Sequence, residues 1–459
     1  MPTLFPCKPF IVAIAVCYVC FSPLPSMAMS LQDAIRASLK NSNVILAARQ
    51  SWIASRESIG SNTSTSDLTA RLTSTGTLAQ TDGRDGKGFN DSNSLGTGIM
   101  LSKNLYDGGQ ATENVRLAQI NLQMASARYA QSEQTVILTT IEAYLEVSKA
   151  QREVKLHDKN LNRLKAHVDA TKIRVDAGAA TPTRLAEAKA RFARAKSDAI
   201  LTQTRFNNAQ DNFRSLTGTS GYVSVQPAMV YNLPKDMLSA ETFAQSAHPD
   251  ILFAIAAEHA ANQAFNTLQA AVRPTVAFSL SANTRMATGT LHDKDEFAAQ
   301  LVFSAPLLST NATTSKARNV AANYEAAKLN RTEAKRKVRV AAREKFRDWE
   351  TTAARLEAVS SEIEAFRLVA EGIASEAQFG QRTMLDLLDA EKDVNDAELS
   401  LVNAEHEQIL AAFRLMAAIG NLTAEQMGVG DVLGPLLDLP ETKNPFQTTF
   451  PFRRILASD

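Results

Sequence analysis

Two carboxylates near the end of the chain have the spacing of groups that act together. Asp386 and Asp389 are three residues apart, so both lie on one face of a helix, where they interrupt the apolar run of Leu385, Leu387 and Leu388. Carboxylates that are crowded together attract cations and raise one another's pKa values. The same spacing is also that of an ordinary solvated stripe. Which interpretation holds depends on where the surrounding helices place the two carboxylates.

Residue patterns typical of catalysis are missing from the sequence. Its six histidines are singletons, and His406-Glu407 has no second histidine four residues after the first, as a zinc-binding HExxH helix requires. There is no GxSxG motif. The glycines Gly83, Gly86 and Gly88 do not lie between a strand and a helix, as a phosphate-cradling loop would. We therefore expect neither an enzyme nor a cofactor or metal site.

Length and composition exclude other classes of protein. The 459 residues include 49 Lys and Arg against 48 Asp and Glu, and a net charge of +1 gives no basic surface for nucleic acid. Only 6% of residues are aromatic, which is few for one large globular core. No run of 18 consecutive apolar residues occurs, so a membrane protein built from helices is excluded.

The N-terminus is organised like a secretory signal. Lys8 precedes an apolar run over residues 10–21, and small residues suited to cleavage follow at Ser26 and Ala28. We predict a signal peptide over residues 1–28 and an exported mature chain. The alternative, a short membrane anchor, is disfavoured because the run is too short to span a bilayer. The mature chain would have no thiol, because the cysteines are Cys7, Cys17 and Cys20.

Long stretches of the mature chain contain neither glycine nor proline. They are residues 110–177, 183–217, 311–371 and 381–419. A continuous helix over the first would be roughly 100 Å long. Apolar residues recur every seven positions in these stretches, which favours coiled coils over ordinary amphipathic helices. One such seam consists of alanines at Ala390, Ala397, Ala404, Ala411 and Ala418.

The chain is an internal duplication. Gly178 and Gly380 are 202 residues apart (380 − 178), and so are Gly218 and Gly420 (420 − 218). Gly178 and Gly380 are therefore predicted to form the turns at the tips of two equivalent helical hairpins. The predicted organisation is a first repeat over 29–220, a linker over 221–238, a second repeat over 239–420 and a Pro-containing C-terminal tail over 421–459.

Each repeat also carries a pair of strands before its long helix. Apolar and polar residues alternate within each strand, and polar loops are predicted at 81–93 and 283–295. Such alternation is typical of transmembrane strands, and one such pair alone would fit a surface hairpin equally well. Four strands cannot close a barrel, so several chains would have to pool them. The fold class is mainly α with a small β part, with β-hairpins at about 67–104 and 274–305 and helical hairpins at about 110–217 and 311–419.

Three local segments connect this organisation to a known family. They are the opening Leu31-x-x-Ala34-Ile35, the turn Leu105-Tyr106-Asp107-Gly108-Gly109, and the string GQRTMLDLLDA over residues 380–390. With the duplication and the helix lengths, these segments resemble the TolC family of outer membrane efflux proteins. The resemblance covers essentially the whole mature chain.

The resemblance implies a homotrimer whose twelve pooled strands form one β-barrel in lipid of the Gram-negative outer membrane. The coiled-coil helices would continue as an α-barrel through the periplasm. It also implies a periplasmic adaptor (membrane fusion protein) and an inner membrane ABC or RND-type transporter at the helical end. Substrates, either proteins and peptides or small toxic compounds, would leave without further chemistry. The sequence leaves the substrate and the class of pump open.

The resemblance further implies a gate at the periplasmic end. Asp386 and Asp389 match the positions of the family's acidic ring, and with threefold symmetry six carboxylates would crowd one constriction and favour cations. Arg382 matches an arginine that ties its helix to a neighbouring helix.

Two departures from the family pattern affect this gate. Arg184 stands where the family often has the acidic partner of Arg382, and Ala377 stands where it has a tyrosine. Asp176 and Glu187 lie near enough in sequence to replace that partner.

Two other functions fit a chain with long helical hairpins. A periplasmic adaptor usually has one such hairpin flanked by compact β-domains, whereas this chain has two hairpins and few strands. A coiled-coil structural protein would have no use for the amphipathic strand pairs. The tail, interrupted by four prolines, is expected to be extended along the helices or disordered, and no function is assigned to it.

Overall fold

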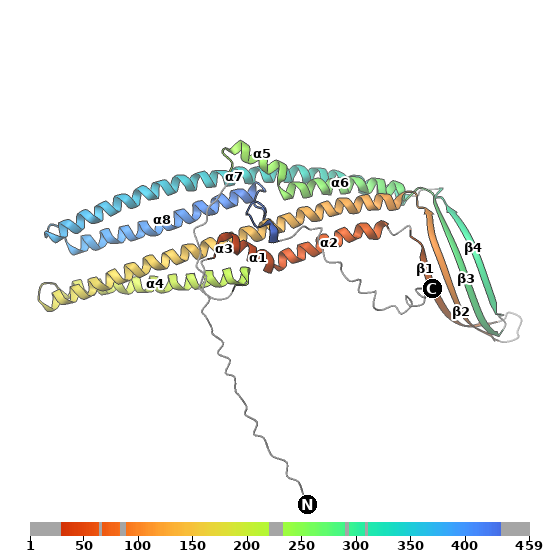
Figure 1. The fold of residues 1–459 in the computed structure, drawn as a ribbon, viewed down its shortest axis with the longest axis horizontal. Helices are drawn as coiled ribbons and strands as arrows, with labels where there is room; N and C mark the ends of the chain where they lie inside the picture. The colour runs from red at the N-terminus through yellow and green to blue at the C-terminus, as the bar shows by residue number, and fades with distance from the viewer. Residues whose placement is uncertain are drawn as a thin grey trace, which may run out of the picture.

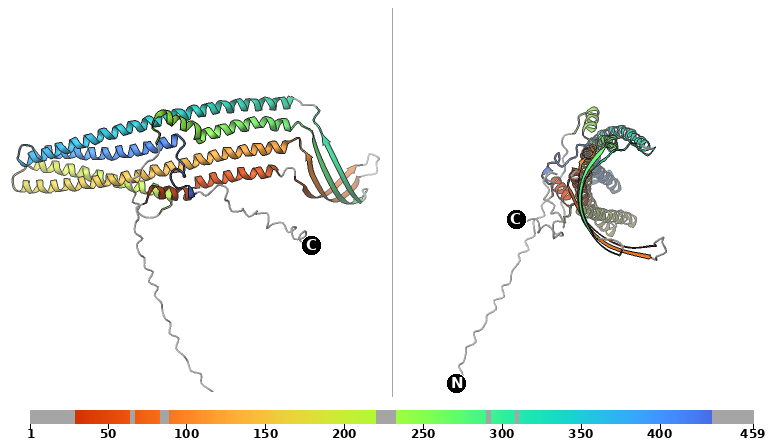
Figure 2. Two further views of the ribbon diagram at one scale, coloured as in Figure 1. Left: turned by 45° about the horizontal axis from the view of Figure 1, so that its top comes forward. Right: turned by 90° about the vertical axis from the view of Figure 1, so that its right-hand side faces the viewer.

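A computed structural model describes residues 29–63, 67–82, 89–219, 233–289, 293–307 and 311–432. The predicted signal peptide with all three cysteines, most of the predicted linker and the last part of the tail lie outside the described residues. Within them, long helices run side by side, and one four-stranded sheet lies at the end opposite the hairpin tips (Figures 1 and 2). The predicted mainly α fold with a small β part is confirmed.

The same order of elements occurs twice. Two shorter helices come first, then two strands, then a very long helix and its returning partner. The first set is α1 (Leu31–Asn41), α2 (Asn43–Thr63), β1 (Thr69–Asp82), β2 (Phe89–Tyr106), α3 (Gln110–Asp176) and α4 (Pro182–Thr217). The second is α5 (Met237–Ala247), α6 (Pro249–Ala270), β3 (Thr275–Gly289), β4 (Lys294–Ser304), α7 (Asn311–Gln378) and α8 (Met384–Ala418).

Local sequence explains where the long helices start and stop. Thr181 caps α4 by accepting a hydrogen bond from the backbone N–H of Arg184, and Pro182 occupies the first helical position, where no backbone donor is needed. Gly178 and Gly380 have φ values of +73° and +75°, which favour glycine, and each lies in the turn between its two helices. None of the described helices is long and apolar enough to cross a bilayer.

The small-residue seams are buried as the heptads require. Ala188, Ala195 and Thr202 on α4 are at most 7% exposed, and Ala390, Ala397 and Ala404 on α8 are equally buried. The larger core lies midway along the molecule, where α1 packs against α3 and α4, and its largest fully buried side chains include Tyr144, Phe213, Phe413, Ile35 and Ile141. Small residues let paired helices approach closely, and the aromatic residues fill the wider middle.

The four strands form one antiparallel sheet in the order β1-β2-β3-β4, so the hairpins of the two repeats join edge to edge. The chain leaves β2 at a turn in which Asp107 accepts hydrogen bonds from the backbone N–H groups of Gly109 and Ala111, at 2.9 and 2.6 Å. Gly108 has φ +71°, and a Cβ there would lie 2.9 Å from the Ala270 carbonyl. This turn therefore fixes the corner between the sheet and the helices.

Two sequence expectations are wrong in detail. The described residues of the loops predicted at 81–93 and 283–295 belong mostly to strands, because β1 reaches Asp82, β2 starts at Phe89, β3 reaches Gly289 and β4 starts at Lys294. Residues 83–88 and 290–292 lie outside the described residues. Backbone pairing continues where the side chains have become polar, so the alternation of side chains underestimated strand length. The tail was expected to be extended or disordered, yet Leu422, Ala424 and Val429 are buried in the larger core, and a 3-10 turn, η2 (Gly430–Val432), follows.

Candidate functional site

The residues that match the proposed gate lie at the tip of the second helical hairpin, where α7 ends and α8 begins. Thr383 and Asp386 form a capping box at the start of α8. The Asp386 carboxylate accepts hydrogen bonds from the backbone N–H and the hydroxyl of Thr383, both at 2.9 Å, and Thr383 Oγ1 accepts one from the Asp386 N–H at 3.2 Å. These bonds hold the pKa of Asp386 below its usual value. Asp386 therefore has a structural role within its own helix.

Arg382 makes its ion pair within the same tip. Its Nε donates to Glu376 Oε2 at 2.9 Å, and this bond raises the pKa of the guanidinium. Within one chain the partner of Arg382 is neither Asp176 nor Glu187, and Glu187 lies 3.5 Å from Arg191. Within one chain, Arg382 therefore stabilises the turn between α7 and α8 and does not link it to the first repeat.

Asp389 makes one of the links between the repeats at this end. Its Oδ1 accepts a hydrogen bond of 2.7 Å from Nη1 of Arg191 on α4, while Nη2 of the same guanidinium lies 3.5 Å from Glu187. The Asp389 side chain remains 55% exposed, and that of Arg191 is 29% exposed. The pair connects α8 of the second hairpin to α4 of the first, close to where both helices begin.

A half-buried cluster lies two residues further along α8. Glu391 Oε2 is 3.2 Å from His167 Nε2 and 3.5 Å from Arg163 Nε, and both partners belong to α3. Burial raises the pKa of Glu391, but the hydrogen bond from His167 and the charges of Arg163 and His167 outweigh it, so the net shift is downward. The carboxylate is thus held charged between the two hairpins.

Further ion pairs continue this contact along antiparallel α3 and α8. Lys159 lies 4.0 Å from Glu398, Arg152 contacts Glu405, and Arg414 donates to Glu142 at 2.7 Å. The sequence analysis did not predict this series of ion pairs. Its signal is a second heptad, Glu391, Glu398 and Glu405 on α8, facing the seven-residue spacing of Arg152 and Lys159 on α3.

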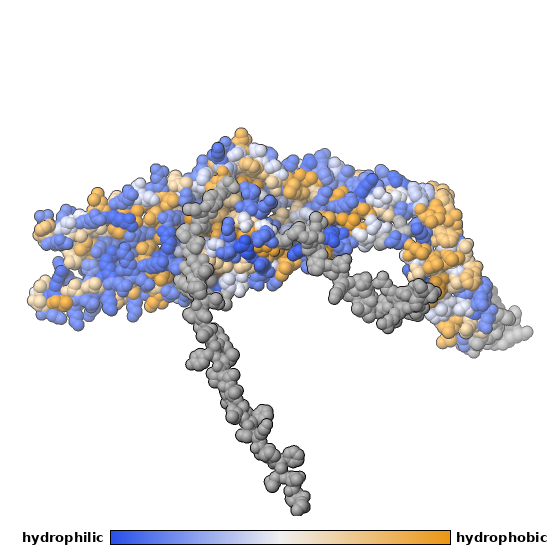
Figure 3. Space-filling view, in the orientation of Figure 1, coloured by the Kyte–Doolittle hydropathy of each residue, from blue (hydrophilic) through white to orange (hydrophobic). Residues whose placement is uncertain are grey.

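The register of the sheet separates a polar face from an apolar face. Rows such as Leu72–Ile99–Ala282–Phe297 alternate with rows such as Thr73–Gly98–Asn283–Glu296. The apolar side chains are exposed, and Phe297 is 85% exposed. Figure 3 shows hydrophobic side chains gathered over the part of the sheet nearest the helices, and mostly hydrophilic side chains along the helical hairpins. One face of the sheet is therefore unsuited to water.

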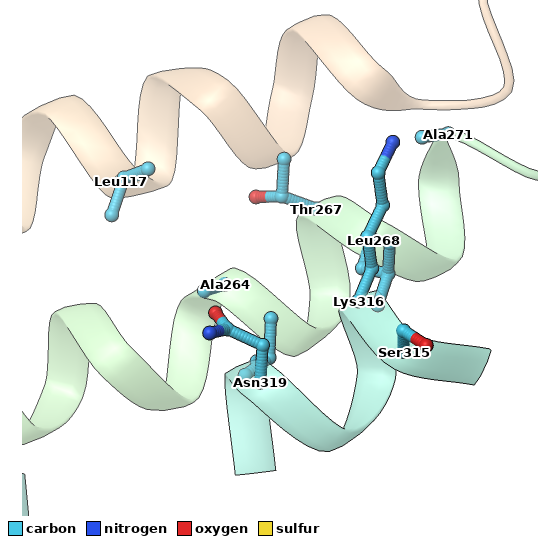
Figure 4. A pocket seen from close by; sticks show the side chains of 9 residues that line it. Leu117, Ala264, Thr267, Leu268, Ala271, Ser315, Lys316 and Asn319 are labelled. Carbon is cyan, nitrogen blue, oxygen red and sulfur yellow. The ribbon is translucent and has the colours of Figure 1, made fainter. Parts of the chain in front are cut away.

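A groove of about 540 Å³ lies between α3, α6 and α7 next to the sheet (Figure 4). Leu117, Ala264 and Leu268 contribute apolar side chains to it, and Lys316 is its one charged lining residue. It offers no acid–base pair. Within the described ranges, no three His, Cys, Asp or Glu side chains come together as metal ligands would.

Comparison with known proteins points in one direction. The family profile described as outer membrane efflux protein matches residues 34–219 and 243–421. The outer membrane efflux protein BepC of Brucella suis is 27% identical over 334 residues, which are 72% of this chain and 73% of that protein. Outer membrane protein TolC of Escherichia coli is 21% identical over 379 residues, covering 79% of this chain and 76% of TolC.

Solved structures share the fold. The CmeC outer membrane channel of Campylobacter jejuni superposes with a TM-score of 0.71 at 16% identity, covering 86% of each chain. The MtrE outer membrane channel of Neisseria gonorrhoeae, in its open state, gives a TM-score of 0.70 at 18% identity and covers 86% of this chain and 90% of MtrE. At these identities the likeness establishes the fold alone.

Proposed function

The chain belongs to the outer membrane efflux protein family, and we propose that it is the outer membrane channel of a tripartite export pump. Substrates, either peptides and proteins or small toxic compounds, would enter at the helical tips and leave through the sheet end without a chemical step. A periplasmic adaptor and an inner membrane ABC or RND-type transporter would deliver them. The observation that carries this proposal is the apolar face of the sheet.

That face fits lipid better than water. In addition to Phe297, its exposed side chains include Leu72, Leu78, Leu301 and Phe303. Exposed apolar side chains gathered on one face are unfavourable in water, whereas the outward band of a transmembrane barrel consists of such residues, with polar residues facing the lumen. The opposite face of this sheet is polar, as a water-filled lumen requires.

The sheet edges support a homotrimer. Strands β1 and β4 are edge strands within one chain. Unpaired backbone groups are costly in lipid, so each edge needs another strand. Pairing β4 of one copy with β1 of the next closes the sheet, and three copies give twelve strands, an even number that suits an outer membrane barrel.

At the other end, we propose that the hairpin tips form the gate. Asp386, Asp389 and Arg382 match the positions of the family's gate, and the structure of one chain adds Arg191 as the partner of Asp389. This pair would hold the second hairpin against the first. The hydrogen bond between Arg191 and Asp389 would have to break for the entrance to widen.

Two measurements test the proposal. The detergent-corrected mass from light scattering should be about three times that of the mature chain, and a stable monomer would contradict the architecture. The second measurement is of orientation, for which a single cysteine can be placed because residues 29–459 contain none. On whole cells Asp295→Cys should react with an impermeant maleimide and Ala179→Cys should not, and the reverse pattern would overturn the orientation.

A further inference from the structure

The polar face of the sheet carries an excess of positive charge. Its charged side chains among the described residues are Arg71, Arg285 and Lys294, against the single carboxylate of Glu296. Three of these four charged side chains, Glu296, Arg285 and Lys294, lie in two neighbouring rows of this face. The rows are Thr73–Gly98–Asn283–Glu296 and Thr75–Gly96–Arg285–Lys294. The charges therefore gather at one level of the sheet, near the β3–β4 turn.

Lys294 and Glu296 neutralise one another at this level. Lys294 Nζ lies 2.9 Å from Glu296 Oε2, two residues along the same face of β4. Asp293, next to the turn, accepts a hydrogen bond of 2.7 Å from the backbone N–H of Ala287. Arg285 stands directly across from Lys294, and no described carboxylate lies within ion-pair distance of it. With Lys294 and Glu296 it leaves the cluster with one net positive charge, although its field also reaches the Glu296 carboxylate.

The surface beside Arg285 is hollowed. A depression of about 310 Å³ lies over Gly96, Gly98, Asn283, Arg285 and Lys294, and Glu296 also lines it. A Cβ at Gly96 would meet no atom closer than 3.9 Å, so no tight packing explains the missing side chain, and its absence leaves space next to the arginine. At Gly98 the Asn283 amide fills that space instead, 2.0 Å from where a Cβ would stand. The hollow thus combines the Arg285 guanidinium with amide and hydroxyl groups and with the paired charges of Lys294 and Glu296.

From this placement we infer that Arg285 forms an anion-attracting ring in the lumen of the β-barrel, so that the outer part of the channel favours anionic solutes. The inference rests on the proposed channel function. Three copies of Arg285 would face one water-filled lumen whose low-dielectric wall concentrates their field. The preferred ligands are small anions such as carboxylates and phosphates, because two oxygens of either group match the guanidinium fork. The acidic residues Asp386 and Asp389 lie at the hairpin tips, at the opposite end of the molecule from the sheet.

The test is ion selectivity in planar bilayers under a potassium chloride gradient, using the purified full-length trimer. Arg285→Gln should lower the ratio of anion to cation permeability about two- to fivefold at low salt, and the difference should shrink at 1 M salt, where screening is strong. Glu296→Gln should shift the ratio the opposite way. Arg285→Lys keeps the charge and should retain most of the preference.

Lys103→Gln is the matched control. It removes one positive charge from the same sheet, but Lys103 pairs with Phe278 in a row of the apolar face, so lumen selectivity should stay unchanged. Equal ratios in wild type, Arg285→Gln and Glu296→Gln would overturn this inference and leave the channel function standing. An equal shift in Lys103→Gln would also overturn it. Failure of the wild-type protein to form any channel would overturn the channel function, and this inference with it.

Discussion

Arg191 and Asp389 are joined by a hydrogen bond of 2.7 Å between Nη1 and Oδ1, although 198 residues separate them along the chain. The contact connects α4 of the first helical hairpin to α8 of the second. It makes the tip of one chain a single unit and gives the acidic position a basic partner.

Arg191→Gln should loosen the tips and raise single-channel conductance in planar bilayers. Because both side chains are partly exposed, the loss of stability should be only about 0.5 kcal/mol. Asp389→Asn should act similarly, and the double variant should add little, since both changes remove one interaction. Lys189→Gln removes the same charge from an exposed position on α4 and is the control. Equal conductance in wild type and Arg191→Gln would show that the pair does not restrict the entrance.

The second expectation separates the two roles of Asp386, which are capping of α8 and attraction of cations. Thr383→Ala removes the N-cap and should cost about 1 kcal/mol, measured by thermal unfolding followed with circular dichroism. Asp386→Asn keeps an acceptor for Thr383 but loses the charge, so block of the channel by multivalent cations should weaken while the trimer persists. The capping bonds lower the pKa of Asp386, so its contribution is present above pH about 4 and is lost as the pH falls through the lowered value. Unchanged cation block in Asp386→Asn combined with Asp389→Asn would show that neither carboxylate attracts cations at the entrance.

The third expectation concerns pH and the cluster around Glu391. The pKa of this carboxyl is lowered in the folded protein, so its stabilising effect is complete above the unfolded value of about 4.3 and disappears as the pH falls through the folded value. Glu391→Gln should therefore flatten the fall in melting temperature between about pH 5 and 3. At neutral pH the difference should stay below about 1 kcal/mol, because the cluster is partly solvated. Glu364→Gln, at an exposed position on α7, should leave the wild-type pH profile intact.

A fourth expectation compares two glycines with the same backbone conformation. Gly380 and Gly420 have φ values of +75° and +78°. A Cβ at Gly380 would meet nothing within 4 Å, so Gly380→Ala should cost only the strain of the left-handed conformation, about 1–2 kcal/mol. A Cβ at Gly420 would lie 2.8 Å from His248 Cα and 3.1 Å from its N, so Gly420→Ala must also displace backbone. Gly420→Ala should therefore be at least about twice as destabilising in urea unfolding, and equal costs would refute the packing argument.

Local patterns in the sequence determine most of the secondary structure. Heptads without glycine or proline define the long helices, because one buried stripe every seven residues needs continuous helix to reach its partner. The turns at Gly178 and Gly380 follow from the same reasoning, since glycine enters the left-handed conformation without strain. The capping box is equally local: Thr383 and Asp386 are three residues apart, so its pattern is visible in the sequence. Alternation locates the strands but not their ends, because backbone pairing is independent of side-chain polarity.

Which charges meet was decided only by the tertiary structure. Arg191 has Glu187 one turn away on its own helix, and its contact with Asp389 arises only because α4 and α8 both pack against α3. The same holds for Glu391, whose partners His167 and Arg163 come from α3. Exposed charges contribute little to folding, so sequence patterning places them weakly, whereas buried seams are specified strongly. Likewise, Arg285 and Lys294 share a row only because β3 and β4 pair in one register, and a slip of one residue would reverse the face on which each lies.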